Sequence, residues 1–398
     1  MKFSQRIEEM QLSPIRKLVP LAEAAKKQGK KVYHLNIGQP DIETPREFFD
    51  AVNNFDEKVL AYAFSQGIPE LIDSFIKYYK GFGVEYDKDQ ILITNGGSEA
   101  LTFALIATCD NGDDVLVPEP FYTNYNSFGK SAGVNIIPIT TKAEDGFKLP
   151  AKSEIQAKIT KKTKAIVLSN PGNPTGAVYS REQIEMVRDL ALENNLYIIA
   201  DEVYREFVYD GLEYVSFAQL KEIEDRVIIT DSISKRYSAC GARIGCIASK
   251  NKELMGQIMK LCQGRLCVAT IEQVGAAALA NVSPDYMKKA FAEYQLRRDV
   301  VYGALKQMEG VICEEPKGAF YIIAKLPVKN AEDFVKWMLT DFSLDNATVM
   351  MAPAEGFYAT PGLGVDEVRL SYVLKKEDLE ASMRILAAGL EEYKKLGR

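Results

Sequence analysis

Five short apolar runs, separated by helical patterns, constrain the fold of this chain more than any other feature. They are residues 90–94 (QILIT), 113–119 (DDVLVPE), 164–170 (KAIVLSN), 196–202 (LYIIADE) and 226–232 (RVIITDS). Between them, apolar residues recur at helical spacing, as in residues 98–109 and 180–195. Short apolar strands alternating with helices are typical of a mostly parallel sheet covered on both faces. The sequence therefore predicts an α/β fold.

The pattern changes after about residue 285. Long polar helical stretches at residues 284–308 and 331–341 are accompanied by shorter strand patterns, FYIIAKL and EVRLSYVL. This change predicts a smaller α+β domain at the C-terminal end. A chain of 398 residues is too long for one ordinary core, so more than one domain is expected. The cleft between two such domains is the first place to expect a ligand.

Composition and charge exclude several classes of function. A formal net charge of −6 gives no electrostatic reason to bind nucleic acid or an anionic membrane. We find no signal peptide and no apolar run that could span a bilayer. The six cysteines show no metal-ligand spacing, so we predict free thiols in a cytoplasmic protein and no metal site. The single histidine, His34, lies in an apolar run, and we interpret it as structural.

Polar motifs, three of which contain glycines, follow four of the apolar runs. They are TNGGSEA (residues 94–100), SNPGNPTG (169–176), ADEVY (200–204) and SISKRYSACGARIG (232–245). Ligands of open α/β sheets bind at the ends of the strands, and amides at a helix start can bind an anion. The plainer alternatives are a turn capped by Ser98, an irregular loop, a helix cap by Asp201 and a solvated loop. The fingerprints of dinucleotide and P-loop nucleotide sites are absent.

Two cationic residues are further candidates for binding a ligand. Lys235 lies between two apolar runs among small residues, which leave room for a bulky ligand. Arg369 alternates with Val368 and Leu370, so we predict it on the polar face of a half-buried strand. There it could make a surface ion pair or clamp a carboxylate.

Taken together and in this order, the motifs resemble those of the fold-type-I aminotransferases (class I/II, aspartate aminotransferase-like), which use pyridoxal 5'-phosphate (PLP). The resemblance runs from LNIGQPD near the N-terminus to RLS near the C-terminus. It implies a large domain with a mostly parallel central sheet covered by helices, plus a smaller α+β domain. We predict an N-terminal arm and part of the small domain at residues 1–45, the large PLP-binding domain at 46–284 and the small C-terminal domain at 285–398.

The resemblance also implies roles for matching residues. Lys235 would hold PLP as a Schiff base and then act as general base, with Asp201 on the pyridine nitrogen. Tyr204 and Asn173 would hydrogen-bond the phenolic oxygen of the ring. Further cofactor contacts are implied for Gly97, Ser98, Glu99, Ser232, Ser234 and Arg243, with Tyr122 stacking on the ring and Tyr62 reaching the phosphate of a second subunit. Substrate contacts are implied for Gly38, Asn173 and Arg369.

The implied activity is ping-pong transfer of an amino group from an L-amino acid to 2-oxoglutarate, and aspartate is the first choice of amino donor. One subgroup uses a lysine for the second carboxylate of the substrate at the position that is Ser98 here. Alanine, neutral or aromatic donors therefore stay open, as does a carbon–sulfur β-lyase. A PLP-binding regulatory domain is disfavoured, because such proteins carry a DNA-binding module first. The resemblance implies a homodimer; Arg236 receives no role beyond a predicted salt bridge.

Overall fold

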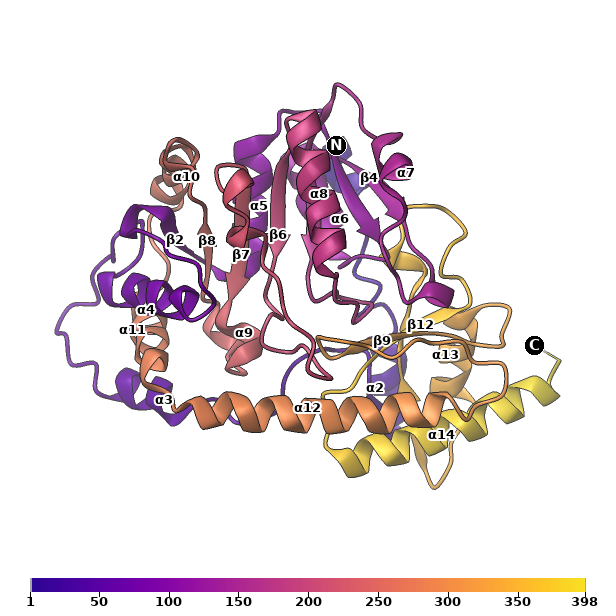
Figure 1. Ribbon diagram of the computed structural model, residues 1–398. Coiled ribbons are helices and arrows are strands. Elements are labelled where there is room, and N and C mark those ends of the chain that lie inside the picture. The colour runs from indigo at the N-terminus through magenta and orange to yellow at the C-terminus, as the bar shows by residue number, and fades with distance from the viewer. Residues whose placement is uncertain (1, 398) are drawn as a thin grey trace.

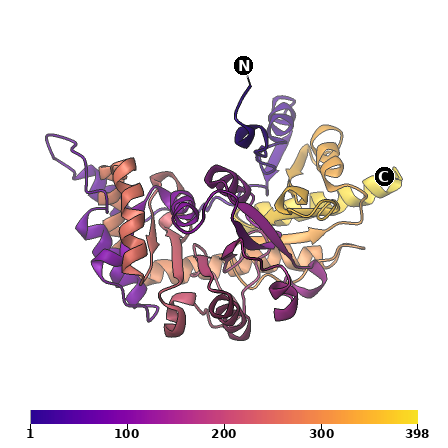
Figure 2. The ribbon, with the colours of Figure 1, turned by 90° about the horizontal axis from the view of Figure 1, so that it is seen from above.

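The computed structural model describes residues 2–397 of the chain. Figure 1 shows two groups of elements, with helix α12 (Pro284–Leu305) running along the lower side beneath both. In the view from above, the indigo N-terminal segment lies on the same side as the yellow C-terminal elements (Figure 2). The two ends of the chain therefore contribute to the same group.

The larger group is built around a seven-stranded sheet with the order β2-β8-β7-β6-β5-β3-β4. Only β8 pairs antiparallel with its neighbours, and the other pairs are parallel. The mostly parallel sheet predicted from the sequence is thus confirmed. Its strands are β2 (Ile91–Thr94), β3 (Asp114–Glu119), β4 (Asn135–Thr140), β5 (Thr163–Ser169), β6 (Tyr197–Asp201), β7 (Val227–Ser232) and β8 (Gly245–Ala248).

Helices cover both faces of this sheet. Because strand side chains alternate, Ile198 packs into one apolar cluster with helices α4 and α8, whereas Ile199 packs into another with α5 and α10. This two-sided burial explains why the strands are apolar throughout. The helices of this group are α3 (Arg46–Asn53), α4 (Pro69–Lys80), α5 (Gly96–Thr108), α6 (Asn124–Ala132), α7 (Lys152–Gln156), α8 (Arg181–Asn194), α9 (Ile233–Arg236), α10 (Lys252–Arg265) and α11 (Thr270–Ala278).

The smaller group combines two short sheets with its own apolar core. Strand β9 pairs antiparallel with β12, which pairs antiparallel with β11, and β1 pairs parallel with β10. Since β1 lies near residue 31 and β10 near residue 347, this pairing joins the start of the chain to its end. The elements are α1 (Gln5–Glu8), α2 (Val19–Lys27), β1 (Lys31–His34), β9 (Tyr321–Lys325), α13 (Ala331–Thr340), β10 (Ala347–Met350), β11 (Ala352–Pro353), β12 (Glu367–Ser371) and α14 (Lys376–Lys395).

The predicted division at residue 284 falls at the start of α12, and the domain limits stay a prediction. One element differs from its sequence pattern. The apolar spacing of residues 13–29 (SPIRKLVPLAEAAKKQG) predicts one helix, but α2 begins only at Val19, with Pro20 in its first turn. Residues 14–18 instead form turns along the site described below. Within residues 2–397, no helix combines the length and apolar character needed to cross a membrane.

Candidate active site

A cavity of about 640 Å³ lies where the ends of β5, β6 and β7 meet β12 and the N-terminal arm. This is the edge of the sheet at which open α/β proteins bind ligands. It brings together most of the residues predicted for the site: Gly38, Gly97, Ser98, Tyr122, Asn173, Asp201, Tyr204, Ser232, Ser234, Lys235, Arg243 and Arg369.

Lys235 lies in the short helix α9, directly after β7. Ser232 caps this helix, with its Oγ accepting a hydrogen bond from the Ser234 amide at 3.1 Å. The Lys235 Nζ donates to the Gly38 carbonyl at 2.8 Å and lies 3.8 Å from the Cys240 Sγ. No carboxylate of the described chain pairs with it, so its amine is held in the cavity by neutral groups.

Gly38 has a steric reason to be glycine. A Cβ at this position would lie 1.9 Å from the Tyr321 hydroxyl. A side chain here would therefore displace Tyr321 and the Gly38 carbonyl that holds the amine of Lys235.

Asp201 ends strand β6 and is only 8% exposed. Its Oδ2 accepts a hydrogen bond from the Tyr125 hydroxyl at 2.8 Å. Burial raises the pKa of Asp201 to about 6, although hydrogen bonds from Tyr125 and the Val203 amide oppose this shift. None of the described residues forms an ion pair with it. A buried carboxylate without a cation is costly, so the geometry suits a cationic ligand group at this position.

Three tyrosines line the cavity beside Asp201. The hydroxyls of Tyr204 and Tyr321 lie 2.8 Å apart, so one donates to the other. Burial raises the pKa of Tyr204 well above its usual value and that of Tyr122 to about 12. Tyr122 and Tyr204 are therefore neutral donors at physiological pH. The Tyr122 hydroxyl is positioned by a hydrogen bond from the Asn124 amide at 2.8 Å.

An anion cradle forms between the start of α5 and the β7 end of the cavity. Gly97 and Ser98 stand in the first turn of α5, where amides point outward and the helix dipole favours negative charge. The hydroxyls of Ser232 and Ser234 lie 2.6 Å apart and face the same space. This set of fixed donors suits a phosphate group.

Arg243 completes the cradle. Gly96 has a φ of +72°, and a Cβ there would lie 2.4 Å from the Arg243 Nη2. Glycine is therefore needed at residue 96 both for the backbone conformation and for the close approach of the guanidinium. The Arg243 Nη1 also donates to the Cys240 carbonyl at 3.0 Å, which orients the group.

Arg369 lies at the opposite wall, and here the sequence prediction needs correction. Strand β12 is buried on both faces rather than half-buried, and Arg369 is 2% exposed, because its polar face is turned into the cavity. The guanidinium donates to the Asn173 Oδ1 at 3.1 Å and to the Asn36 carbonyl at 2.6 Å. Its Nε has no hydrogen-bond partner among the described residues. A buried guanidinium with an unused donor suits a carboxylate ligand.

Two predicted residues are not brought to the cavity. The Glu99 carboxylate accepts a hydrogen bond from the Asn95 amide at 2.8 Å and pairs with Arg265 at 3.4 Å, so it caps α5 instead. Tyr62 is 81% exposed on an outer loop. Asn36, Tyr125 and Tyr321 were missed by the sequence prediction. Because their partners are remote in sequence, no local pattern marks them.

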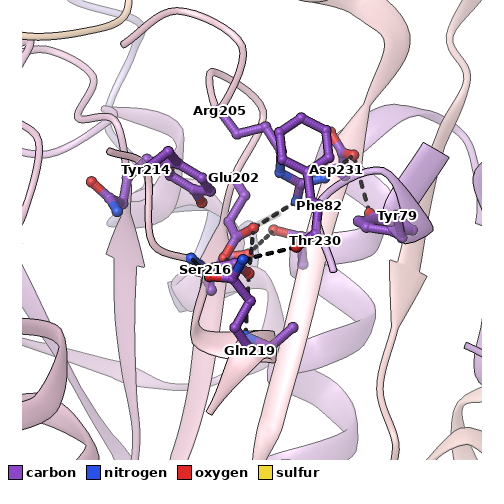
Figure 3. Close-up of polar contacts among 12 residues, drawn as sticks. Tyr79, Phe82, Glu202, Arg205, Tyr214, Ser216, Gln219, Thr230 and Asp231 are labelled. Carbon is purple, nitrogen blue, oxygen red and sulfur yellow. Dashed lines mark hydrogen bonds and ion pairs between the residues drawn. The ribbon is translucent and has the colours of Figure 1, made fainter. Parts of the chain in front are cut away.

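A network of buried charges lies behind the cavity, next to the strand ends. The Arg205 guanidinium pairs with Glu202 at 2.6 Å and with Asp231 at 3.3 Å (Figure 3). Arg236 pairs with Asp231 at 3.0 Å, which confirms the predicted salt bridge, and stacks on the Tyr78 ring at 3.8 Å. The Asp231 Oδ1 also accepts from the Ser232 amide at 2.7 Å. Asp231, which directly precedes the cradle residue Ser232, is thus linked to Arg236, which directly follows Lys235.

We expect Asp231→Asn to destabilise the protein by about 3 kcal/mol, because Arg236 loses its only ion-pair partner among the described residues while it stays buried. Urea unfolding measures this change. The matched control is Glu23→Gln, which breaks the exposed pair with Lys26 and should destabilise the protein far less. Equal losses for the two variants would contradict a structural role for the network.

Comparison with known proteins identifies the family of the chain. The family model for aminotransferase class I and II matches residues 30–386, so the chain belongs to this family. It is 32% identical to the aspartate aminotransferase of Pyrococcus horikoshii, and the match covers 98% of each protein.

Solved structures agree with this result. The aspartate aminotransferase of Thermotoga maritima matches with a TM-score of 0.89 at 30% identity, covering 98% of this chain and 100% of that one. The alanine aminotransferase of Pyrococcus furiosus gives the same TM-score and coverages at 32% identity. The chain is therefore an aminotransferase of the aspartate aminotransferase-like type, in a family that uses PLP.

Proposed function

We propose that this chain binds PLP and transfers the amino group of an L-amino acid, with aspartate as the first choice, to 2-oxoglutarate. The observation that carries this proposal is one cavity that joins three residues: Lys235, the buried Asp201, which pairs with no cation of the described chain, and Arg369 with an unused Nε. The amine of Lys235 suits the aldehyde of the cofactor, and the carboxylate of Asp201 suits its pyridinium nitrogen. The guanidinium of Arg369 suits the carboxylate of the substrate.

The residues of the chain fit the cofactor group by group. Asp201 would hold the protonated ring nitrogen, and the Tyr204 hydroxyl and Asn173 amide would donate to the phenolic oxygen. The Asn173 Oδ1 already accepts from Arg369, which leaves its Nδ2 free to donate. The cradle of Ser232, Ser234, Arg243 and the first amides of α5 would hold the phosphate, and Tyr122 would stack on the ring. When bound, PLP supplies an electron sink for the α-carbon of an amino acid.

The chain then performs binding and proton transfer. Arg369 would hold the α-carboxylate of the substrate, which places the α-carbon near Lys235. The Lys235 Nζ would be the covalent anchor of the cofactor and also the base that takes the proton from the α-carbon of the substrate. The Gly38 carbonyl, 2.8 Å from this nitrogen, fixes where the proton is received.

We also propose that two copies pair and that the enzyme works in the cytoplasm. Tyr62 is 81% exposed, which suits a side chain that reaches a second subunit. The cysteines are free thiols, which suits a reducing compartment. Light scattering of the holoenzyme at several concentrations tests the dimer, and a monomer at all of them would refute it.

Half-reactions across a panel of amino acids test the main proposal. The PLP-loaded enzyme receives one amino acid without an acceptor, and the visible absorbance of the cofactor is followed. We expect aspartate to change it fastest, and 2-oxoglutarate to restore it. If no amino acid changes the spectrum, the proposed transfer is wrong. Release of pyruvate and ammonia without an acceptor would indicate a β-lyase instead.

A further inference from the structure

An unpaired arginine of the N-terminal arm lines the cavity. Ser13, Ile15 and Arg16 form part of its wall. The Arg16 side chain is exposed and makes no hydrogen bond or ion pair with any residue from 2 to 397. Its neighbour Lys17, in contrast, pairs with Glu332 at 2.6 Å and does not line the cavity. Arg16 therefore offers a free guanidinium to a ligand in the cavity.

The arm holds this position through contacts of its own. The Ile15 carbonyl accepts a hydrogen bond from the Asn36 Nδ2 at 2.9 Å, and the Asn36 carbonyl accepts one from the Arg369 Nη2 at 2.6 Å. Pro14 packs so closely on Gly356 that a Cβ there would lie 2.7 Å from the proline. The residue before Arg16 is thus linked through Asn36 to Arg369, so Arg16 belongs to the carboxylate end of the cavity.

The other cations of the cavity wall are already committed. Arg369 faces the α-carboxylate, Arg243 forms part of the phosphate cradle, and Lys235 carries the reaction. Residue 98, at the start of α5, is a serine and brings no charge. Among the residues that line the cavity, Arg16 is the one remaining cation.

We propose that Arg16 binds the second carboxylate of a dicarboxylic substrate and so gives the enzyme its preference for aspartate and 2-oxoglutarate over alanine and pyruvate. This inference rests on the proposed aminotransferase function and names the residue that selects its substrate class. A charge-assisted hydrogen bond from Arg16 forms only with a substrate that carries a second carboxylate. Alanine has none, so Arg16 would raise kcat/KM for aspartate relative to alanine.

The experiment compares Arg16→Met with the matched control Lys17→Met in the PLP-loaded enzyme. We expect Arg16→Met to lower the ratio of kcat/KM for aspartate over alanine by roughly tenfold or more, since a charged hydrogen bond is lost. Lys17→Met, which removes the adjacent positive charge outside the cavity, should leave the ratio unchanged. Arg369→Met should lower kcat/KM for both amino acids, because both carry an α-carboxylate.

Binding of maleate, a dicarboxylate that cannot transaminate, gives a readout independent of turnover. Titration calorimetry should show roughly tenfold weaker maleate binding to Arg16→Met, with propionate binding unaltered and Arg16→Lys intermediate. If Arg16→Met and wild type bind maleate equally, or if maleate and propionate weaken by the same factor, the inference is wrong. If wild type reacts with no amino acid, the proposed function fails, while maleate binding still decides the role of Arg16.

Discussion

Lys235→Ala should abolish transamination, with kcat for the best amino acid reduced by roughly 10³-fold or more. The substitution removes the residue proposed both as the covalent anchor and as the base that takes the α-proton. The Lys235 side chain hydrogen-bonds only the Gly38 carbonyl and the Cys240 sulfur in the described chain, so its loss should leave the fold intact. Single-turnover absorbance measurements give the rate, and circular dichroism checks the fold.

Two comparisons separate a proton-transfer role from a general loss of charge. Lys252→Ala removes an exposed lysine that pairs with Asp87 and Asp89, and it should keep full activity. Methylamine added to Lys235→Ala should restore part of the rate, because a small amine fits the space left by the side chain. A Lys235→Ala enzyme that keeps more than a tenth of the wild-type rate would show that another group serves as the base.

The sequence predicts the large sheet well because its information is local. Four of the five apolar runs lead directly into a polar motif, as with Asp201 at the end of β6 and Lys235 in α9, which follows β7. Since parallel strands end at one edge of a sheet, their adjacency in space follows from the fold class alone. The same logic placed the anion cradle, because the turn before α5 and the end of β7 reach the same edge.

The parts that the sequence did not predict depend on long-range packing. Tyr125 reaches Asp201 from a helix 76 positions earlier, and Tyr321 reaches Tyr204 from 117 positions later. Arg369 looks half-buried in its alternation pattern, but the opposite wall of the cavity covers its polar face. Residues 13–18 look helical, whereas contacts with Asn36 and Gly356 hold them along the cavity. No local periodicity encodes these contacts.

Local motifs and long-range contacts supply different parts of the proposed site. The groups proposed to hold the cofactor come from local motifs of the large sheet, which suits one chemistry shared by many aminotransferases. The groups proposed to hold the substrate, Arg369 and Arg16, come from the two ends of the chain. Asn36 links them, because it accepts a hydrogen bond from Arg369 and donates one to Ile15, the residue before Arg16. Substrate preference can therefore change by substitution in the arm without disturbing the residues that carry the reaction.

Asp201→Asn should stabilise the cofactor-free protein but lower the activity of the PLP-loaded enzyme. In the working enzyme we expect kcat/KM to fall by roughly 10²- to 10³-fold, because the charge proposed to keep the ring nitrogen protonated is lost. In the cofactor-free protein, burial raises the pKa of Asp201 to about 6, so the ionised carboxylate is unfavourable in the folded state. The Tyr125 hydroxyl can still donate to the amide oxygen of the asparagine.

The sign of the stability effect follows from the raised pKa. Asp201 supports the folded state fully below the unfolded pKa of about 4, and this contribution is lost as the pH rises through about 6. At pH 8 the cofactor-free Asp201→Asn protein should therefore be more stable than wild type, by up to about 3 kcal/mol. The difference should shrink towards pH 4. Thermal unfolding at both pH values measures it.

Addition of PLP should reverse the order of stability at pH 8. A ligand that binds the folded state raises the unfolding temperature according to its affinity, and wild type should gain more than Asp201→Asn because only wild type offers an anion to the ring nitrogen. Asp89→Asn, at an exposed carboxylate paired with Lys252, should behave as wild type in both states. If the cofactor-free Asp201→Asn protein is less stable than wild type at pH 8, or if PLP stabilises both equally, Asp201 does not hold a cationic group of the cofactor.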